Sequence, residues 1–225
     1  MKTFDTAFNT LLDKISKKEN FAFTRFSDGE LFIMQNKTVI LAKDHYVTGD
    51  IKGPNIYVGT ENFKYMIDLH EGDHPNLTFS NLLINANYRR FVEEMIPLFQ
   101  DREIIYIVNE NADISRLPFD IKKTFEIGAN CMINDYETAE KVKRYINEND
   151  IENHIVLCSA ASLSNYVIYE CFKDNQSNTF LDIGSCLNPL LKLEGWKYTR
   201  GYLTHYWLGK NSNFGTQVDV WQVID

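Results

Sequence analysis

Short apolar runs that alternate with amphipathic segments constrain the fold of this chain more than any other feature. The runs lie at residues 103–108, 123–127, 154–158 and 179–183, and helix-like segments lie at 135–146 and 163–172. Strands buried on both faces of a sheet give continuous apolar runs, and parallel strands need long crossover connections. The pattern therefore predicts an α/β fold, a Rossmann-like sandwich in which helices flank a mainly parallel sheet.

The N-terminal half fits the same class. Residues 1–18 carry apolar side chains on one helical face, which is typical of a core helix and not of an export signal. Residues 21–26 alternate as a strand does, and residues 80–100 have apolar side chains at helical spacing, which predicts the longest helix. No repeat or Pro/Gly-rich linker divides the sequence, so we expect a single domain over residues 1–225.

Charge, hydropathy and cysteine usage exclude several classes of protein. With 31 acidic against 23 basic side chains, the net charge of −8 disfavours binding along a nucleic-acid backbone. The apolar runs are far shorter than the roughly 20 residues of a membrane-spanning helix, so no transmembrane segment is expected. The cysteines form no CxxC pair, which indicates buried, reduced thiols in a cytoplasmic protein. They are Cys131, Cys158, Cys171 and Cys186.

Ligands of such sheets bind beyond the carboxyl ends of the strands. Four loops meet that description, at residues 27–30, 109–111, 159–162 and 182–185, and a parallel sheet would bring them to one edge. In the second loop we take Asn109 as a candidate ligand-binding residue.

The first of these loops holds two carboxylates, Asp28 and Glu30, on either side of Gly29. On a helix they would point about 200° apart, but an extended or tightly turned backbone lets both face one cation. Mg²⁺ and Mn²⁺ are commonly held by one or two carboxylates together with substrate phosphates. The alternative is a solvated turn before a helix, with Glu30 at the positive end of the helix dipole.

The third loop follows a predicted strand and opens a predicted helix. The small residues Ser159 and Ala160 would let a phosphate approach the backbone N–H groups. No GxxxxGK[ST] motif is present, so this is not a P-loop. The alternative is tight packing between strand and helix, with Ser159 or Ser162 as the N-cap.

The fourth loop begins with Asp182, a candidate ligand for a ribose or sugar hydroxyl. Residues 181–185 also resemble the first motif of methyltransferases that bind S-adenosylmethionine, although residues 186–188 replace its glycine-rich continuation. The remaining alternative is an aspartate that only caps the loop.

Together these segments resemble the GT-D-type glycosyltransferases, bacterial enzymes with a Rossmann-like fold that transfer a sugar from a nucleotide-sugar donor. Residues 25–31, Arg-Phe-Ser-Asp-Gly-Glu-Leu, are similar to the family's Arg-Phe-Gly-Asp-Gly-Glu signature. A strand with a small-residue turn at 156–162 and a last strand at 181–184 follow in the family's order. The resemblance covers residues 21–196. It departs from the family at Ser27, which replaces a glycine, at the turn 159–161, and at Ser185, where many members have histidine.

The resemblance implies that Asp28 and Glu30 bind Mn²⁺ or Mg²⁺ and the donor diphosphate, with Arg25 and Gly29 beside them. It thus implies a metal-dependent transfer of a sugar, by analogy glucose, from a UDP-sugar to a glycan, glycoprotein or lipid-linked acceptor. Asp182 is a candidate for the base that removes the acceptor proton, and Glu110 is a weaker one.

Two other functions stay open. One is a non-catalytic module of the same fold that docks on a glycosylation partner, and the other is a small-molecule methyltransferase. The sequence also leaves open whether the chain forms a homo-oligomer.

Overall fold

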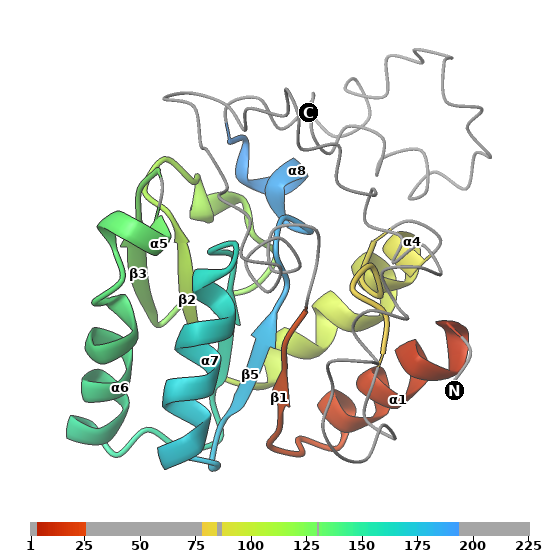
Figure 1. The fold of residues 1–225 in the computed structure, drawn as a ribbon. Helices are drawn as coiled ribbons and strands as arrows, with labels where there is room; N and C mark the ends of the chain where they lie inside the picture. Colours follow the sequence, from red (N-terminus) through yellow and green to blue (C-terminus); the bar gives the residue numbers. More distant parts are fainter. Residues whose placement is uncertain (1–3, 26–77, 85–86, 130, 194–225) are drawn as a thin grey trace, which may run out of the picture.

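A parallel β-sheet forms the centre of the protein. The structure, a computed structural model, describes residues 4–25, 78–84, 87–129 and 131–193 (Figure 1). Within these residues the sheet has five strands, all parallel, in the order β1-β5-β4-β2-β3. They are β1 (Ala22–Phe23), β2 (Ile104–Asn109), β3 (Lys123–Ile127), β4 (Ile155–Cys158) and β5 (Thr179–Asp182). The predicted α/β class is confirmed, and the arrangement is consistent with a Rossmann-like fold.

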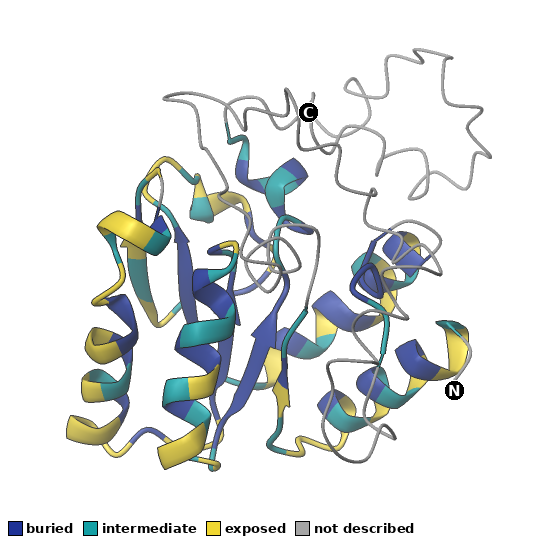
Figure 2. Ribbon diagram, in the orientation of Figure 1, coloured by how far each residue is buried: buried dark blue, intermediate teal, exposed yellow. Residues whose placement is uncertain are grey.

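Helices cover both faces of the sheet (Figures 1 and 2). Successive residues of the central strands point to opposite faces, so they pack into two separate hydrophobic cores. Tyr106 and Leu157 face a core that includes helix α1 (Phe4–Ser16) and helix α8 (Asn188–Leu191). Ile107 and Val156 face the other core. That core is closed by α5 (Cys131–Asn134), α6 (Thr138–Glu148) and α7 (Leu163–Asp174). Burial on both faces is the reason why β2, β4 and β5 appear as uninterrupted apolar runs.

Most predicted elements are confirmed with nearly the predicted bounds. The predicted strand at 123–127 is β3. The predicted strand at 103–108 contains most of β2, and those at 154–158 and 179–183 contain all of β4 and all of β5. The predicted helix at 163–172 lies within α7. The segment 1–18 contains α1. The four cysteines are buried, as expected. None of the described helices is both long and apolar enough to cross a membrane.

One predicted element is wrong. Residues 80–100 do not form a single long helix, and among the described helices α1, with 13 residues, is the longest. Turns at 80–84 precede α4 (Tyr88–Arg90), the π-helix η2 (Phe91–Met95) and the 3₁₀-helix η3 (Ile96–Asp101). Pro97 has no backbone N–H and so cannot continue an α-helical hydrogen-bond ladder. The apolar spacing identified the buried side of the segment but not its helix type.

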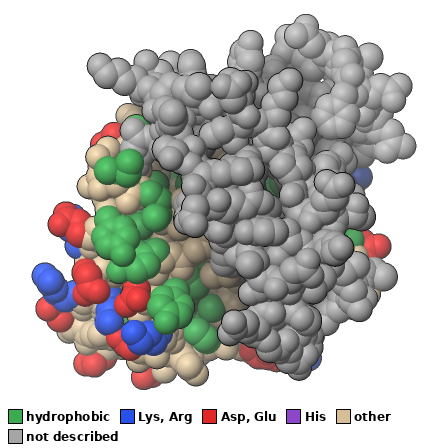
Figure 3. Space-filling view, in the orientation of Figure 1, with side chains coloured by type: hydrophobic (Ala, Val, Ile, Leu, Met, Phe, Trp, Pro, Cys, Tyr) green, Lys and Arg blue, Asp and Glu red, His purple; other side chains and the backbone are tan. Residues whose placement is uncertain are grey.

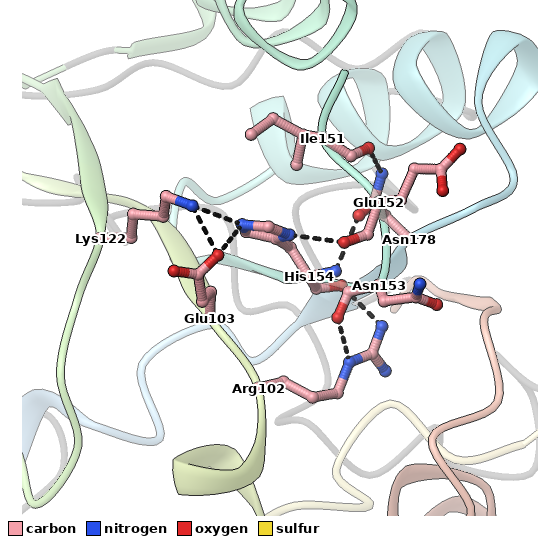
Figure 4. A network of polar contacts seen from close by, with 8 residues as sticks. All are labelled: Arg102, Glu103, Lys122, Ile151, Glu152, Asn153, His154 and Asn178. Carbon is pink, nitrogen blue, oxygen red and sulfur yellow. Dashed lines mark hydrogen bonds and ion pairs between the residues drawn. The ribbon is translucent and has the colours of Figure 1, made fainter. Parts of the chain in front are cut away.

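A network of hydrogen bonds and ion pairs connects the chain segments at the amino ends of the strands, and Figure 4 shows part of it. The Arg102 guanidinium donates to Asn20 Oδ1 (2.7 Å), Thr179 Oγ1 (2.7 Å) and the backbone carbonyls of Asn153 (2.6 Å) and His154 (2.9 Å). These partners lie on the segments that lead into β1, β4 and β5, so one side chain joins three strands.

His154 extends this network toward β2 and β3 (Figure 4). Its Nδ1 lies 2.8 Å from the Glu152 carbonyl, and its Nε2 lies 2.8 Å from Glu103 Oε2 and 3.3 Å from Lys122 Nζ. The hydrogen bond from Lys122 to Glu103, 2.5 Å long, lowers the pKa of the Glu103 carboxyl. An open pocket of about 320 Å³ lies beside these residues, and the Glu103 carboxylate among its lining residues is paired with Lys122 and His154. We therefore assign the network a structural role.

Candidate functional site at the carboxyl edge

The described loops of the predicted site do lie at one edge of the sheet. Asn109 ends β2, Ser159 follows β4, Asp182 ends β5, and Arg25 follows β1 by two residues. All four strands are parallel, so these residues share the carboxyl edge. The loop at 27–30, with Asp28, Gly29 and Glu30, lies outside the described residues.

The backbone diverges above two neighbouring strands at this edge. The loop after β4 leads to α7, which packs in one core, whereas the loop after β5 leads to α8, which packs in the other. The two loops therefore turn to opposite faces of the sheet (Figure 1). In open α/β sheets, ligands bind in the crevice that such a divergence leaves.

A buried ion pair joins the ends of β1 and β5. Arg25 Nη2 donates to Asp182 Oδ1 across 3.0 Å, and the two side chains are only 15% and 5% exposed. The backbone N–H of Gly184 also donates to Asp182 Oδ1, across 2.9 Å. Cys158 is the register partner of Asp182 on β4, and its pKa is raised by burial and then by the Asp182 charge. In this geometry Asp182 holds Arg25 and the turn that follows β5.

Gly184 makes room for the arginine. Its φ of +49° lies in the left-handed region, and a Cβ built on it would be 1.8 Å from Arg25 Nη2. The space that glycine leaves open is therefore filled by a side chain of the protein itself. In the methyltransferase motif the glycines allow a cofactor to approach the backbone, so this packing disfavours the methyltransferase alternative.

Two further contacts fix Arg25. Its Nη1 donates to the Ser80 carbonyl (3.3 Å), and its own carbonyl accepts from Asn165 Nδ2 (3.1 Å) in the first turn of α7. The side chain of Arg25 is thus held by the end of β5 and by the turn at residue 80, and its backbone is held by α7. Sequence reasoning missed Ser80, and the only signal for Asn165 was its place just after the candidate turn at 159–162.

The turn after β4 is closed by its own hydrogen bonds. Ser159 Oγ lies 2.9 Å from the hydroxyl of Tyr106, a fully buried residue on β2 whose pKa is raised by burial. The backbone N–H of Ala160 donates to Ser164 Oγ (3.0 Å), and Ala161 has a φ of +46°. Ser162 occupies the N-cap position of α7 without a side-chain cap hydrogen bond. Of the predicted phosphate donors, the Ala160 N–H is therefore already used inside the protein.

The loop after β2 is also held by hydrogen bonds between its own residues. Asn109 Oδ1 accepts from the backbone N–H of Asn111 (2.9 Å) and from its side-chain amide (3.2 Å), which closes a local turn. The neighbouring Glu110 is exposed. Neither residue contacts Arg25 or Asp182 through a hydrogen bond among the described residues.

In the described part of the chain, no three His, Cys, Asp or Glu side chains are grouped so that they could hold a metal ion. The carboxylates expected to do so, Asp28 and Glu30, are not in that part. Comparison of the chain with protein-family models, with curated proteins and with solved structures found no match.

Proposed function

We propose that this protein is a metal-dependent glycosyltransferase that moves a sugar, with glucose as the first candidate, from a UDP-sugar to a glycan, glycoprotein or lipid-linked acceptor. The observation that carries the proposal is the ion pair between Arg25 and Asp182. It joins two segments that are 157 positions apart in the sequence and that both carry the resemblance to GT-D-type enzymes. They meet where the loops after β4 and β5 diverge, which is where an α/β sheet binds its ligand.

Under this proposal Asp28 and Glu30 hold Mn²⁺ or Mg²⁺, and the ion holds the donor diphosphate. The bound metal would supply Lewis-acid stabilisation of the charge on the departing nucleoside diphosphate. It would also let a protein with a net charge of −8 bind an anionic donor, because a divalent cation reverses the local field. Arg25, which is anchored by its contacts, would fix the start of the segment that carries Asp28 and Glu30.

The described residues suggest a division of roles at the edge. Asp182 is engaged by Arg25 and by the Gly184 N–H, so we assign it to positioning Arg25 and not to removing the acceptor proton. Ser159 is partly exposed and keeps lone pairs and a rotatable hydroxyl, so it is the described side chain best placed to contact a donor.

Calorimetric titration with UDP, with and without Mn²⁺, tests the proposal. We expect binding by the wild type that requires Mn²⁺ and is lost in Asp28→Ala/Glu30→Ala. The matched control is Glu93→Ala/Glu94→Ala, which removes two carboxylates from an exposed helical surface and changes the net charge equally. Circular dichroism of each variant checks that it is folded.

Each outcome decides between the functions. Mn²⁺-dependent binding that only the first double variant loses supports a donor site and selects UDP-sugars for activity assays. Binding that both double variants keep would place the nucleotide elsewhere. Absence of UDP binding in the wild type would refute the UDP-sugar proposal and favour the non-catalytic module.

A further inference from the structure

Asn165, in the first turn of α7, connects that helix to the end of β1. Its Nδ2 donates to the backbone carbonyl of Arg25 across 3.1 Å, and 140 positions separate the two residues in the sequence. The same Arg25 forms the buried ion pair with Asp182. Because α7 begins just after the turn at 159–162, this hydrogen bond joins the loop after β4 to the chain that leaves β1.

The hydrogen bond fixes how the amide group of Asn165 is turned. A carbonyl oxygen can only accept, so Nδ2 must face Arg25 and Oδ1 must face away from it. Within the described part of the chain, Oδ1 is shielded from water and accepts no hydrogen bond. A shielded amide oxygen without a donor destabilises a folded protein, and native structures contain few of them. Stability alone therefore does not explain why asparagine occupies this position.

Asn165 also differs from the solvated side chains of α7. Figure 3 shows hydrophobic side chains and charges of both signs on the outer surface over this part of the molecule. Tyr169, one turn after Asn165, is 62% exposed, whereas the side-chain oxygen of Asn165 is covered. A polar group that water cannot reach keeps the hydrogen bond that the protein offers, because the loss of that bond is not replaced by solvent. The amide therefore holds the Arg25 carbonyl in one place.

We propose that Asn165 is a positioning residue of the site that binds the nucleoside diphosphate of the donor. This role rests on the proposed glycosyltransferase function. Asn165 fixes the backbone of Arg25, while Asp182 and the Ser80 carbonyl fix its guanidinium. Both ends of Arg25 are thereby set relative to Ser159 and the loop after β4. A residue that keeps an unpaired oxygen in order to hold another group in place lowers stability in favour of function.

Calorimetric titration of UDP into the full chain, at saturating Mn²⁺, tests the role of Asn165. Asn165→Leu is nearly isosteric and removes both the donor and the unpaired oxygen. We expect the dissociation constant to rise roughly 3- to 10-fold, the range that corresponds to the loss of one hydrogen bond. The midpoint of urea unfolding should stay close to that of the wild type, because the cost of the unpaired oxygen disappears together with the hydrogen bond.

Asn149→Leu is the matched control. Asn149 Nδ2 donates to the Tyr145 carbonyl across 2.9 Å, which is the same kind of hydrogen bond, at the exposed C-cap of α6. This variant should leave the dissociation constant for UDP unchanged. Asn165→Ala, which also lacks the amide and favours a helix, is a second variant and should weaken UDP binding to the same extent.

The unfolding measurement separates positioning from folding. A variant with the urea midpoint of the wild type is fully folded in buffer, so a higher dissociation constant must arise at the site. Wild-type affinity in both Asn165 variants would overturn the proposal and leave the glycosyltransferase function standing. So would a rise that the unfolded fraction of the variant accounts for, or an equal rise in Asn149→Leu. A wild type that does not bind UDP with Mn²⁺ would overturn both proposals.

Discussion

Arg25 Nη2 and Asp182 Oδ1 lie 3.0 Å apart although 157 positions separate the two residues in the sequence. Both side chains are largely shielded from water, at 15% and 5% exposure. Removal of one partner of a buried pair leaves an uncompensated charge, which destabilises a protein far more than the loss of a surface pair. The contact is therefore expected to matter to folding as well as to the candidate site.

Asp182→Ala is expected to lower the free energy of unfolding by about 3–5 kcal/mol, measured by urea denaturation. The control is Glu94→Ala, which breaks the more exposed pair with Arg90 and should cost about 0.2–1 kcal/mol. Arg25→Met/Asp182→Leu removes both charges and should lose less than Asp182→Ala alone. Equal losses for Asp182→Ala and Glu94→Ala would contradict the buried pair.

Two glycines at the same edge provide a matched comparison. Gly184→Ala should destabilise the protein by roughly 1–3 kcal/mol, since the new Cβ would be in the left-handed region and would displace the Arg25 guanidinium. At Gly128 the nearest atom to a Cβ is Glu110 Oε1 at 3.4 Å, an ordinary contact, so Gly128→Ala should be almost neutral. Thermal unfolding of both variants measures the difference. Similar melting temperatures would show that Gly184 is not required for the packing of Arg25.

The amino-end network predicts a second large effect. Arg102→Met removes four hydrogen bonds and leaves the buried His154 backbone without this partner, so we expect a loss on the order of 3 kcal/mol in urea denaturation. Arg102→Lys keeps the charge but cannot reach four separate acceptors, so it should recover only part of the loss. Arg144→Met, at an exposed position on α6, should change stability by less than about 0.5 kcal/mol. A neutral Arg102→Met would refute the structural role of the network.

We expect alkaline pH to lower the free energy of unfolding, because burial raises the pKa of thiols in the folded protein. Burial raises the pKa of Cys171 from 9.0 to about 12. Above pH 9 the unfolded chain therefore binds fewer protons at this thiol than the folded protein does. The resulting stabilisation is complete below the unfolded pKa and is lost as the pH rises toward the folded pKa.

The pH dependence can be isolated with one variant. Cys171→Ala creates a cavity and lowers stability at every pH, but its deficit relative to the wild type should shrink by about 1 kcal/mol between pH 9 and 10. Urea denaturation at several pH values, under reducing conditions, measures this deficit. A deficit that does not change with pH would mean that the Cys171 thiol titrates alike in the folded and unfolded states.

The strands β2, β4 and β5 could be predicted from the sequence because they are buried on both faces of the sheet. β4 and β5 lie inside the predicted runs, since an apolar run needs no knowledge of its neighbours to be recognised. β3 also has the predicted bounds, but it was expected to be a buried strand and only Ile127 of its five residues is buried. The segment at 80–100 could not be predicted in the same way. Its buried side chains, among them Tyr88, Phe91 and Phe99, satisfy a helical period, but the period does not distinguish α, π and 3₁₀ hydrogen bonding.

The sequence was enough to predict which loops form the candidate site, but not which of their residues contact one another. A parallel sheet places the loops after β2, β4 and β5 at one edge whatever the strand order. The pairing of Arg25 with Asp182 depends on β1 lying beside β5, which no local pattern indicates. The amino-end network was missed, although Arg102, Lys122 and His154 each directly precede or begin a predicted apolar run and could have been recognised as one polar edge.

The position of β1 has a consequence for biosynthesis. Among the described strands β1 pairs only with β5, through Ala22 with Phe180 and Phe23 with Leu181. A ribosome that adds about 5–20 residues per second reaches Asp182 roughly 8–30 s after it has made Arg25. During this interval β1 has no partner among the described strands, so this edge of the sheet closes only after β5 has been made. A released chain that ends before residue 179 should therefore lack the contact between Arg25 and Asp182, and the edge of β4 that pairs with β5 would stay open.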